Sequence, residues 1–354
     1  MRLSRLRLSL YTTTATPASL LDRPERLRRT RWAMSVILGC IALGTSARAA
    51  EPVHELCVVV GAAGEADFEQ GFEQAARAWE RAAARGGITC TLIGLEPEAA
   101  EADREKVKRW LEQRANSSTT PTWLVYLGHG TFDGREARLN LRGPDVTAKE
   151  LGAWLAPLKR PLVFVHGGSA GAPFIPALSA GGRILITATR SGNELNYARF
   201  GERFAEAVAN PSADIDQDGQ TSVLEAFVTA AQQVQAFYAE HGRLATEHAL
   251  IDDNGDKQGT PAEWYRGTRL QRRPKGAAEP DGARANLIAI LPSMSERSLT
   301  AEQRETRAQL EQELEAVRAR KSVMSEPDYY RQLELIFRRL EKVYRGNPAS
   351  EKTR

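Results

Sequence analysis

Long apolar stretches are absent from the body of this sequence, and both aromatic residues and cysteine are scarce. The chain has 354 residues, of which 7% are aromatic and three are cysteine. Its apolar residues are spread along the chain, which excludes a polytopic membrane protein. With 42% hydrophobic and 26% charged residues, the composition is that of a globular protein with one large core or two smaller ones.

A strong excess of one charge is also missing once the first 50 residues are set aside. The formal net charge is +3, but residues 1–50 contain nine arginines and only two acidic residues. The rest of the chain has 39 basic and 43 acidic residues, with both signs interspersed. This balance gives no reason to expect binding to a phosphate backbone, and we predict no nucleic-acid partner.

Residues 1–50 have the features of a secretory signal peptide. A basic stretch at 26–32 is followed by an apolar stretch at 33–44 and by Ala47-Arg48-Ala49, which fits an A-x-A cleavage site. We expect the protein to be exported, as a periplasmic or secreted protein, with no membrane span in the mature chain.

Only Cys57 and Cys90 remain after that cleavage, each within a short apolar run. In an oxidising compartment the two can form a disulfide, and as buried thiols they can equally stay unpaired. The sequence leaves both outcomes open. Neither cysteine lies beside a motif that would make it a nucleophile.

From residue 55 onward, short apolar runs of β type alternate with helical patterns. Near-continuous apolar strands separated by helices predict an α/β domain at 51–270, with a mostly parallel sheet covered on both faces. The predicted strands are 55–61, 88–94, 122–128, 161–167 and 183–189, and the helices between them are 66–85, 99–115 and 148–157.

A different unit follows this domain. Residues 271–297 are basic, contain glycine and proline and show no periodicity, which predicts a linker. Residues 298–346 carry apolar residues at helical spacing on both sides of a break at 326–328, where Ser325 is a suitable N-cap. This pattern predicts an antiparallel helical hairpin.

The loops after the third and fourth predicted strands hold the candidate catalytic residues. The third strand ends in Gly128-His129-Gly130, and the fourth ends in the glycine-rich segment 166–171. In an open α/β sheet, ligands bind beyond the carboxyl ends of the strands, and adjacent strands bring such loops together. His129 is suited to general-base catalysis because imidazole titrates near neutrality.

These segments resemble the caspase-like cysteine peptidases, and among them the legumain branch. The resemblance rests on the strand order, on YLGHG at 126–130 and on the small-residue turn Ser169-Ala170-Gly171, and it covers residues 55–265. It implies a caspase-like three-layer sandwich. It also implies that His129 is the catalytic base and that the backbone N–H of Gly130 helps to form an oxyanion hole.

The nucleophile of that family is missing here. In its place stands Gly168 or, with a shift of one residue, Ser169. A neutral hydroxyl is a far weaker nucleophile than a thiolate and needs stronger activation by a base. We therefore predict a non-catalytic peptidase homologue that binds a peptide or protein partner in its cleft.

Two alternatives stay open. Residues 167–171 fit G-x-S-x-G, which predicts an active hydrolase, a peptidase or esterase, that uses Ser169 with His129. Against this hydrolase, His241 and His248 have no evident aspartate partner in a strand-end loop. The other alternative is a structural calcium-binding protein of the envelope.

The most specific motif in the sequence predicts a calcium site. Residues 214–225 fit D-x-[DN]-x-[DN]-G-x₅-E at every specified position and lie between two helical patterns. Alternating carboxylates supply the oxygen ligands that calcium prefers, and Gly219 permits the sharp turn. The predicted ligands are Asp214, Asp216, Asp218, Gln220 through its carbonyl, Ser222 through water and Glu225.

Two further polar segments favour a purely structural interpretation. Residues 252–263 resemble a second calcium loop, but Lys257 occupies the glycine position, which favours a tight acidic turn. Arg190 and Glu194 follow the fifth predicted strand, where an ion-paired turn is favoured over a ligand-binding role.

Overall fold

The computed structural model describes residues 54–97, 101–115, 121–276 and 279–345. The predicted signal region, residues 1–50, lies outside these ranges. Among the described residues, no helix has both the length and the apolar character that crossing a membrane requires.

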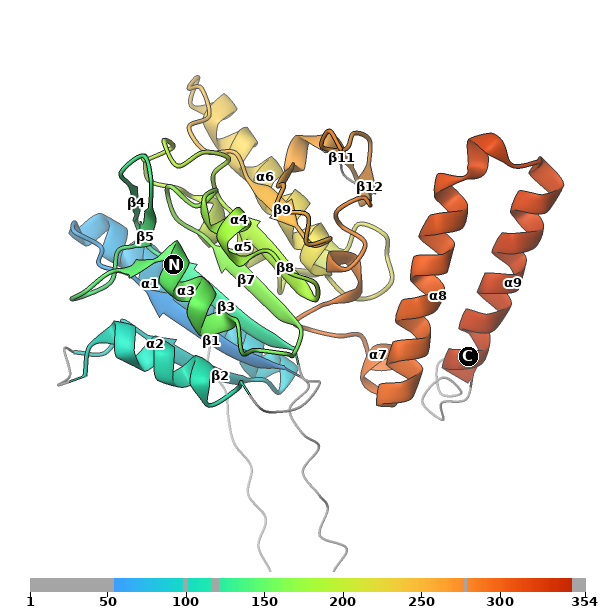
Figure 1. Cartoon of the computed structure of the whole chain (residues 1–354), viewed down its shortest axis with the longest axis horizontal. Coiled ribbons are helices and arrows are strands. Elements are labelled where there is room, and N and C mark those ends of the chain that lie inside the picture. Colours follow the sequence, from blue (N-terminus) through green and yellow to red (C-terminus); the bar gives the residue numbers. More distant parts are fainter. Residues whose placement is uncertain (1–53, 98–100, 116–120, 277–278, 346–354) are drawn as a thin grey trace, which may run out of the picture. The chain divides into compact units, whose positions relative to one another are not determined.

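A seven-stranded sheet forms the centre of the α/β domain (Figure 1). Its order is β10-β9-β8-β7-β3-β1-β2, in which β8, β7, β3, β1 and β2 pair in parallel, and β9 pairs antiparallel with both β8 and β10. The strands are β1 (Glu55–Val60), β2 (Thr89–Ile93), β3 (Thr122–Leu127), β7 (Leu162–His166), β8 (Arg183–Thr187), β9 (Leu250–Asp252) and β10 (Thr260–Pro261). All five predicted strands are therefore confirmed, and the two short antiparallel strands are additional.

Helices cover both faces of this sheet, so the predicted three-layer α/β architecture is confirmed. One face packs against α1 (Ala66–Gly86), α5 (Phe200–Ala207) and α6 (Val223–Glu240), and the other against α2 (Asp103–Glu112), α3 (Ala148–Leu155) and α4 (Phe174–Leu178). Side chains alternate along β7: Val163 and Val165 belong to the first core, whereas Phe164 belongs to the second. Burial on both faces explains the near-continuous apolar runs of the sequence.

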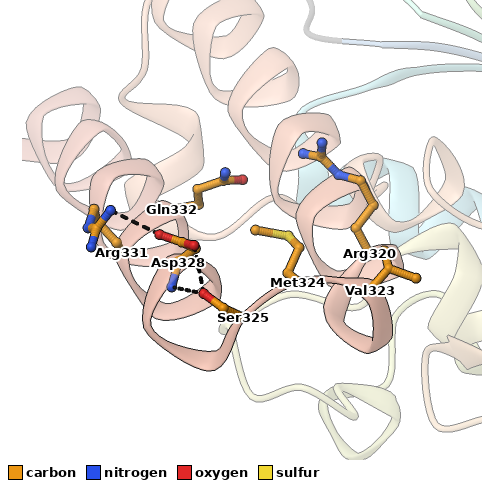
Figure 2. Close-up of a pocket in the computed structure, with 7 residues that line it drawn as sticks. All are labelled: Arg320, Val323, Met324, Ser325, Asp328, Arg331 and Gln332. Carbon is orange, nitrogen blue, oxygen red and sulfur yellow. Dashed lines mark hydrogen bonds and ion pairs between the residues drawn. The ribbon is translucent and has the colours of Figure 1, made fainter.

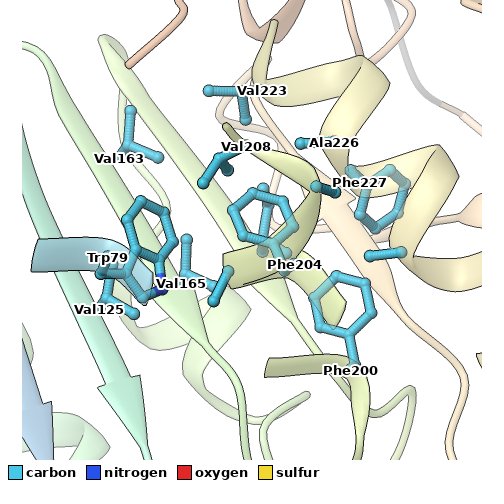
Figure 3. Packing of buried hydrophobic residues seen from close by; sticks show 14 of the residues in the cluster. Trp79, Val125, Val163, Val165, Phe200, Phe204, Val208, Val223, Ala226 and Phe227 are labelled. Carbon is cyan, nitrogen blue, oxygen red and sulfur yellow. The ribbon is translucent and has the colours of Figure 1, made fainter. Parts of the chain in front are cut away.

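The core between the sheet and α1, α5 and α6 is rich in large aromatic side chains (Figure 3). Trp79 from α1 lies against Phe204 from α5, with 5.8 Å between the ring centroids. Phe200 and Phe227 continue the cluster onto α6, at 6.1 Å. This packing holds α5 and α6 together, and the predicted calcium loop lies between these two helices in the chain.

Short elements outside the main sheet follow the third strand and the sixth helix. A small antiparallel sheet consists of β4 (Gly130–Phe132), β5 (Ala137–Leu139) and β6 (Val146–Thr147). A second pair is formed by β11 (Tyr265–Arg266) and β12 (Arg269–Leu270). The single-turn 3₁₀ helices are η1 (Pro211–Ala213), η2 (Ala262–Trp264), η3 (Ala285–Leu287) and η4 (Lys321–Val323).

The predicted helical hairpin is present as α8 (Ala301–Ala319) and α9 (Glu326–Arg345). It has its own apolar core, which includes Leu310, Leu314 and Ile336. Ser325 accepts the N–H of Asp328, as expected of the N-cap of α9. Figure 2 shows a hollow at the turn between the two helices, lined by the side chains of Arg320, Val323, Met324, Ser325, Asp328, Arg331 and Gln332.

The segment 271–297, expected as a linker, is in part packed and ordered. Asp281, Ala285 and Ile290 are buried, and α7 (Met294–Arg297) forms a short helix within it. The N–H groups of Asp253 and Asn254 both donate to the Asp281 carboxylate. These contacts bind the segment to the α/β domain, which its polar composition does not reveal.

Cys57 and Cys90 are both free thiols. Cys57 pairs in register with Thr91, and Cys90 with Leu56, so the two cysteines point to opposite faces of the sheet. Cys57 lies in the core beneath α2 and α3, whereas Cys90 packs against the opposite core. Of the two outcomes that the sequence left open, the structure has the unpaired thiols.

Candidate functional site

The carboxyl ends of β3 and β7 are adjacent, with Tyr126 opposite His166 in the parallel register. The segment from Gly128 to Gly130 leaves one strand, and the segment from Gly167 to Gly171 leaves the other. The predicted convergence of these two loops at one edge of the sheet is therefore present.

Ser169 is held by the backbone of Gly130 in both directions. Its Oγ accepts the N–H of Gly130 at 3.0 Å and donates to the carbonyl oxygen of Gly130 at 3.1 Å. The residue is only 1% exposed. The single hydroxyl hydrogen is thus already used, and none of the hydrogen bonds of the described residues joins Ser169 to His129.

The backbone N–H of Gly130 is occupied by its hydrogen bond to Ser169. The resemblance implied that this group helps to form an oxyanion hole, but in the structure it donates to Ser169 Oγ. A substrate oxyanion would have to displace that hydroxyl to reach it.

Gly168 has no room for a side chain. A Cβ atom at this position would lie 1.8 Å from the carbonyl oxygen of Gly128, a backbone atom that cannot swing away. The next residue but one, Ala170, has a φ of 55°, a left-handed conformation that is uncommon outside glycine. A nucleophilic side chain at position 168 is therefore incompatible with this turn.

His129 is oriented by a backbone carbonyl and by aromatic rings. Its Nε2 lies 3.1 Å from the carbonyl oxygen of Ala63, and since a carbonyl only accepts, Nε2 carries the proton. The basic lone pair is then on Nδ1. Edge contacts to Phe68 and Phe72, with centroids 5.1 and 5.4 Å away, hold the ring in this pose.

A second histidine, His166, lies buried beneath the turn. Its Nδ1 accepts the N–H of Gly168 at 3.3 Å, and its Nε2 has no hydrogen-bond partner. Burial lowers the pKa of His166 to about 4, so the ring is neutral at physiological pH. His166 supports the glycine-rich turn from below and does not reach the surface.

A third histidine has the carboxylate partner that the sequence did not make evident. His248 Nδ1 donates to Glu194 Oε1 at 2.7 Å, and the carbonyl of Glu194 accepts the N–H of Ala170. Arg190 completes the ion-paired turn at 3.5 Å from Glu194, as expected. This partner is a glutamate, not an aspartate, and it lies in the loop after β8.

The predicted calcium loop brings its alternating carboxylates together. Oxygen atoms of Asp214, Asp216 and Asp218 lie within 4.8 Å of one another. Burial, followed by the charges of Glu225, Asp218 and Asp214, raises the pKa of Asp216 to about 6. Gly219 has a φ of 90°, which the turn requires.

The other predicted ligands have partners within the protein. Glu225 is buried, accepts the N–H groups of Ile215 and Asp216 through Oε1, and forms a capping box with Ser222 at the start of α6. The Gln220 side-chain oxygen accepts the N–H of Ser293. Glu225 is thus anchored between the loop backbone at Ile215 and Asp216 and the start of α6 at Ser222.

Comparisons with known proteins give little beyond these observations. No protein family and no curated protein matches the sequence. Among solved structures, the chain is similar to the Drosophila initiator caspase Dronc, with 12% identity, a TM-score of 0.37, and coverage of 58% of this chain and 81% of that chain. At so low a TM-score, the likeness carries no conclusion about function.

Replacing Gly168 tests the space at the turn. Gly168→Ala is expected to lower the free energy of unfolding by about 1–3 kcal/mol, because its Cβ collides with backbone. Gly181→Ala is the matched control, since a Cβ there meets nothing within 4 Å, and it is expected to change stability by less than about 0.5 kcal/mol. Urea denaturation measures both, and equal effects of the two variants would contradict the crowded turn.

The buried His166 predicts a contribution to acid sensitivity. Its pKa is about 4 in the folded chain against 6.5 for the free side chain, so between these values the unfolded chain binds more protons. Stability from this residue is complete above pH 6.5 and decreases as the pH falls, by about 3 kcal/mol at pH 4.

His166→Asn, which does not titrate in this range, removes that dependence. The difference in unfolding free energy between the wild type and His166→Asn, measured by urea denaturation from pH 7 to pH 4, is expected to change by that amount in favour of the variant. A difference that stays constant over the range would show that His166 is protonated equally in both states.

Proposed function

We propose that this protein is an exported, non-catalytic relative of the caspase-like peptidases. In this proposal it binds a peptide or protein partner at the carboxyl edge of its sheet and a calcium ion in the loop 214–225. Export rests on the signal-like residues 1–50, and relatedness to peptidases rests on the residues at 126–130 and 169–171.

The proposal that the protein is non-catalytic rests on the two hydrogen bonds between the Ser169 hydroxyl and the Gly130 backbone. A serine becomes a nucleophile when a base within hydrogen-bond reach takes its proton. Here the Ser169 hydroxyl donates to a backbone carbonyl, which is not a base, and it is buried. The Ser169 side chain therefore links the two loops through hydrogen bonds, and we call this link the Ser169 tie.

The charged and polar residues around the Ser169 tie support the proposal that a partner binds there. Arg190 is half exposed, and His248 and His129 lie in the loops at the same edge, each with one ring nitrogen held by a fixed partner. Such groups offer a positive charge and hydrogen-bonding nitrogens to an extended peptide. No nucleic-acid partner is part of the proposal, because the body of the chain is mildly acidic.

An active serine hydrolase is the second candidate, favoured by the pair of His248 and Glu194. A carboxylate that orients an imidazole is the supporting half of a catalytic triad. The Ala170 N–H, which donates to the Glu194 carbonyl, links this pair to the residue after Ser169. For catalysis, Ser169 would have to leave Gly130 and turn towards a histidine.

Hydrolysis of a mixed peptide and ester library separates the two candidates. The purified wild type, Ser169→Ala, His129→Ala and His248→Ala are compared with and without calcium. We expect turnover equal to buffer for all four, because Ser169 has no base as partner. Wild-type turnover that disappears in Ser169→Ala and in either histidine variant would establish the hydrolase instead.

The calcium part of the proposal rests on the three clustered aspartates. Asp214, Asp216, Asp218 and Glu225 would hold the ion, with the carbonyl of Gln220 and, through water, Ser222. A bound calcium ion would neutralise carboxylates whose pKa is raised by burial and, to a smaller extent, by the charges of the neighbouring carboxylates, as for Asp216 and Asp218. Its role would be to join the end of α5 to the start of α6.

Calcium is therefore expected to stabilise the fold. At a concentration 100 times the dissociation constant, it should add about 2.7 kcal/mol to the unfolding free energy. Asp218→Asn should lose most of that gain, whereas Asp133→Asn, which changes an exposed turn aspartate elsewhere, should keep it. Thermal melts with calcium or chelator measure the effect, and an equal gain in both variants would contradict a site in this loop.

A further inference from the structure

The loop between β9 and β10 reproduces the local geometry of the calcium loop. Asp252, Asn254, Asp256 and Gln258 occupy the alternate positions that Asp214, Asp216, Asp218 and Gln220 occupy in residues 214–220. In both loops the fourth and sixth positions have positive φ: 61° and 90° in the first loop, 82° and 70° in the second.

The internal hydrogen bonds correspond at the third and fifth positions, whereas at the first position Asp214 accepts the N–H groups of Asp218 and Gly219 and Asp252 accepts that of Gly255. The N–H of Gln220 donates to Asp218 Oδ1, and the N–H of Gln258 donates to Asp256 Oδ1. Lys257 stands where the first loop has Gly219, and it adopts the left-handed conformation that glycine favours. Its side chain is exposed, so its ammonium group can remain in solvent. Lysine at this position therefore does not prevent the loop from folding.

One buried carboxylate oxygen without a hydrogen-bond partner points to a ligand. Asp252 is only 1% exposed, and its Oδ2 has no hydrogen-bond partner. Its other oxygen accepts the N–H of Gly255 at 3.0 Å, which turns the carboxylate into the loop. A buried carboxylate oxygen without a hydrogen-bond partner is unfavourable, and a cation in the loop would supply the missing interaction.

The surroundings add negative charge to this loop. Asp253 and Asp281 are also buried, and the Asp281 carboxylate accepts the N–H groups of Asp253 and Asn254. Arg284 is the basic residue that contacts them, through the carbonyl oxygen of Asp253. The loop thus has an excess of oxygen ligands and negative charge.

We propose that the loop 252–258 is a second calcium site, held by the carboxylates of Asp252 and Asp256, the side-chain oxygen of Asn254 and the backbone carbonyl of Gln258, with water completing the coordination. Calcium fits better than magnesium, because it accepts an irregular set of six to eight oxygens. This site is additional to the one proposed for 214–225 and does not depend on it.

The position of the loop indicates a structural role. Leu250 lies opposite Thr187, the last residue of β8, and Asp252 lies opposite Leu185, so β9 runs towards the amino end of β8. The loop therefore lies at the amino ends of the parallel strands, whereas Ser169 lies at their carboxyl ends. Lys257 N–H donates to Ser179, and the Asn254 amide donates to the carbonyl of Glu279, so an ion here would join the edge hairpin to two neighbouring segments.

Calorimetric titration of the metal-stripped full chain with calcium chloride tests this site. We expect two bound ions in the wild type. Asp256→Asn should weaken one of them at least tenfold and leave the other unchanged, and Asp218→Asn should do the reverse. Asp133→Asn is the matched control, because Asp133 also accepts backbone N–H groups in a tight turn but has no such cluster around it.

Two further variants test the role of the buried carboxylate and of Lys257. Asp252→Asn should raise the melting temperature in chelator, because a buried unpaired charge is removed, and should lose the rise that calcium gives through this loop. If Asp252→Asn does not fold, Asp256→Asn provides the test of the site, since the Asp256 side chain is only partly buried. Lys257→Gly should tighten the second binding event several-fold, because a nearby positive charge is removed.

The outcomes distinguish this site from the first one. A single binding event that Asp218→Asn abolishes and Asp256→Asn leaves intact would overturn the second site alone. A single event that only Asp256→Asn abolishes would support the second site and overturn the first. No binding by the folded wild type would overturn both.

Discussion

The close approach of the Ser169 and Gly130 segments is the constraint on which the carboxyl edge of the sheet depends. One hydroxyl satisfies both the N–H and the carbonyl of a residue 39 positions earlier in the chain. The glycines around it follow from that approach, since a Cβ at Gly130 would lie 2.2 Å from the carbonyl oxygen of Ser169. A turn closed in this way positions loops accurately and leaves no free nucleophile.

The carboxyl ends and the amino ends of the parallel strands carry different kinds of side chain, and we refer to them as the carboxyl edge and the amino edge of the sheet. The carboxyl edge carries imidazoles and an arginine, each oriented by a fixed partner, which suits recognition of another chain. The hairpin of β9 and β10 ends at the amino edge and carries a carboxylate-rich loop around Asp252. Between them, the aromatic core around Trp79 and Phe204 fixes α5 and α6 and thereby the loop 214–225. In our proposals, partner binding and cation binding use separate residues, so that each could change without the other.

Features that depend on local pattern were predictable from the sequence, and features that depend on distant contacts were not. The five parallel strands have continuous apolar runs because both of their faces are buried. β9 and β10, at three and two residues, are too short to give such a signal. The link between Ser169 and Gly130 and the pair of His248 and Glu194 join residues 39 and 54 positions apart, so no spacing rule reveals them. Lys257 adopts the left-handed φ that the pattern reserves for glycine, and the sequence does not predict this because lysine rarely has that conformation.

Covalent labelling is the most direct test of whether Ser169 is a structural tie or a nucleophile. The folded protein, with and without calcium, is treated with a fluorophosphonate, which reacts with activated serines, and its peptides are mapped by mass spectrometry. A hydroxyl that donates to the Gly130 carbonyl predicts no adduct on Ser169. An adduct on Ser169 that disappears in His129→Ala or His248→Ala would contradict the tie and show an activated serine.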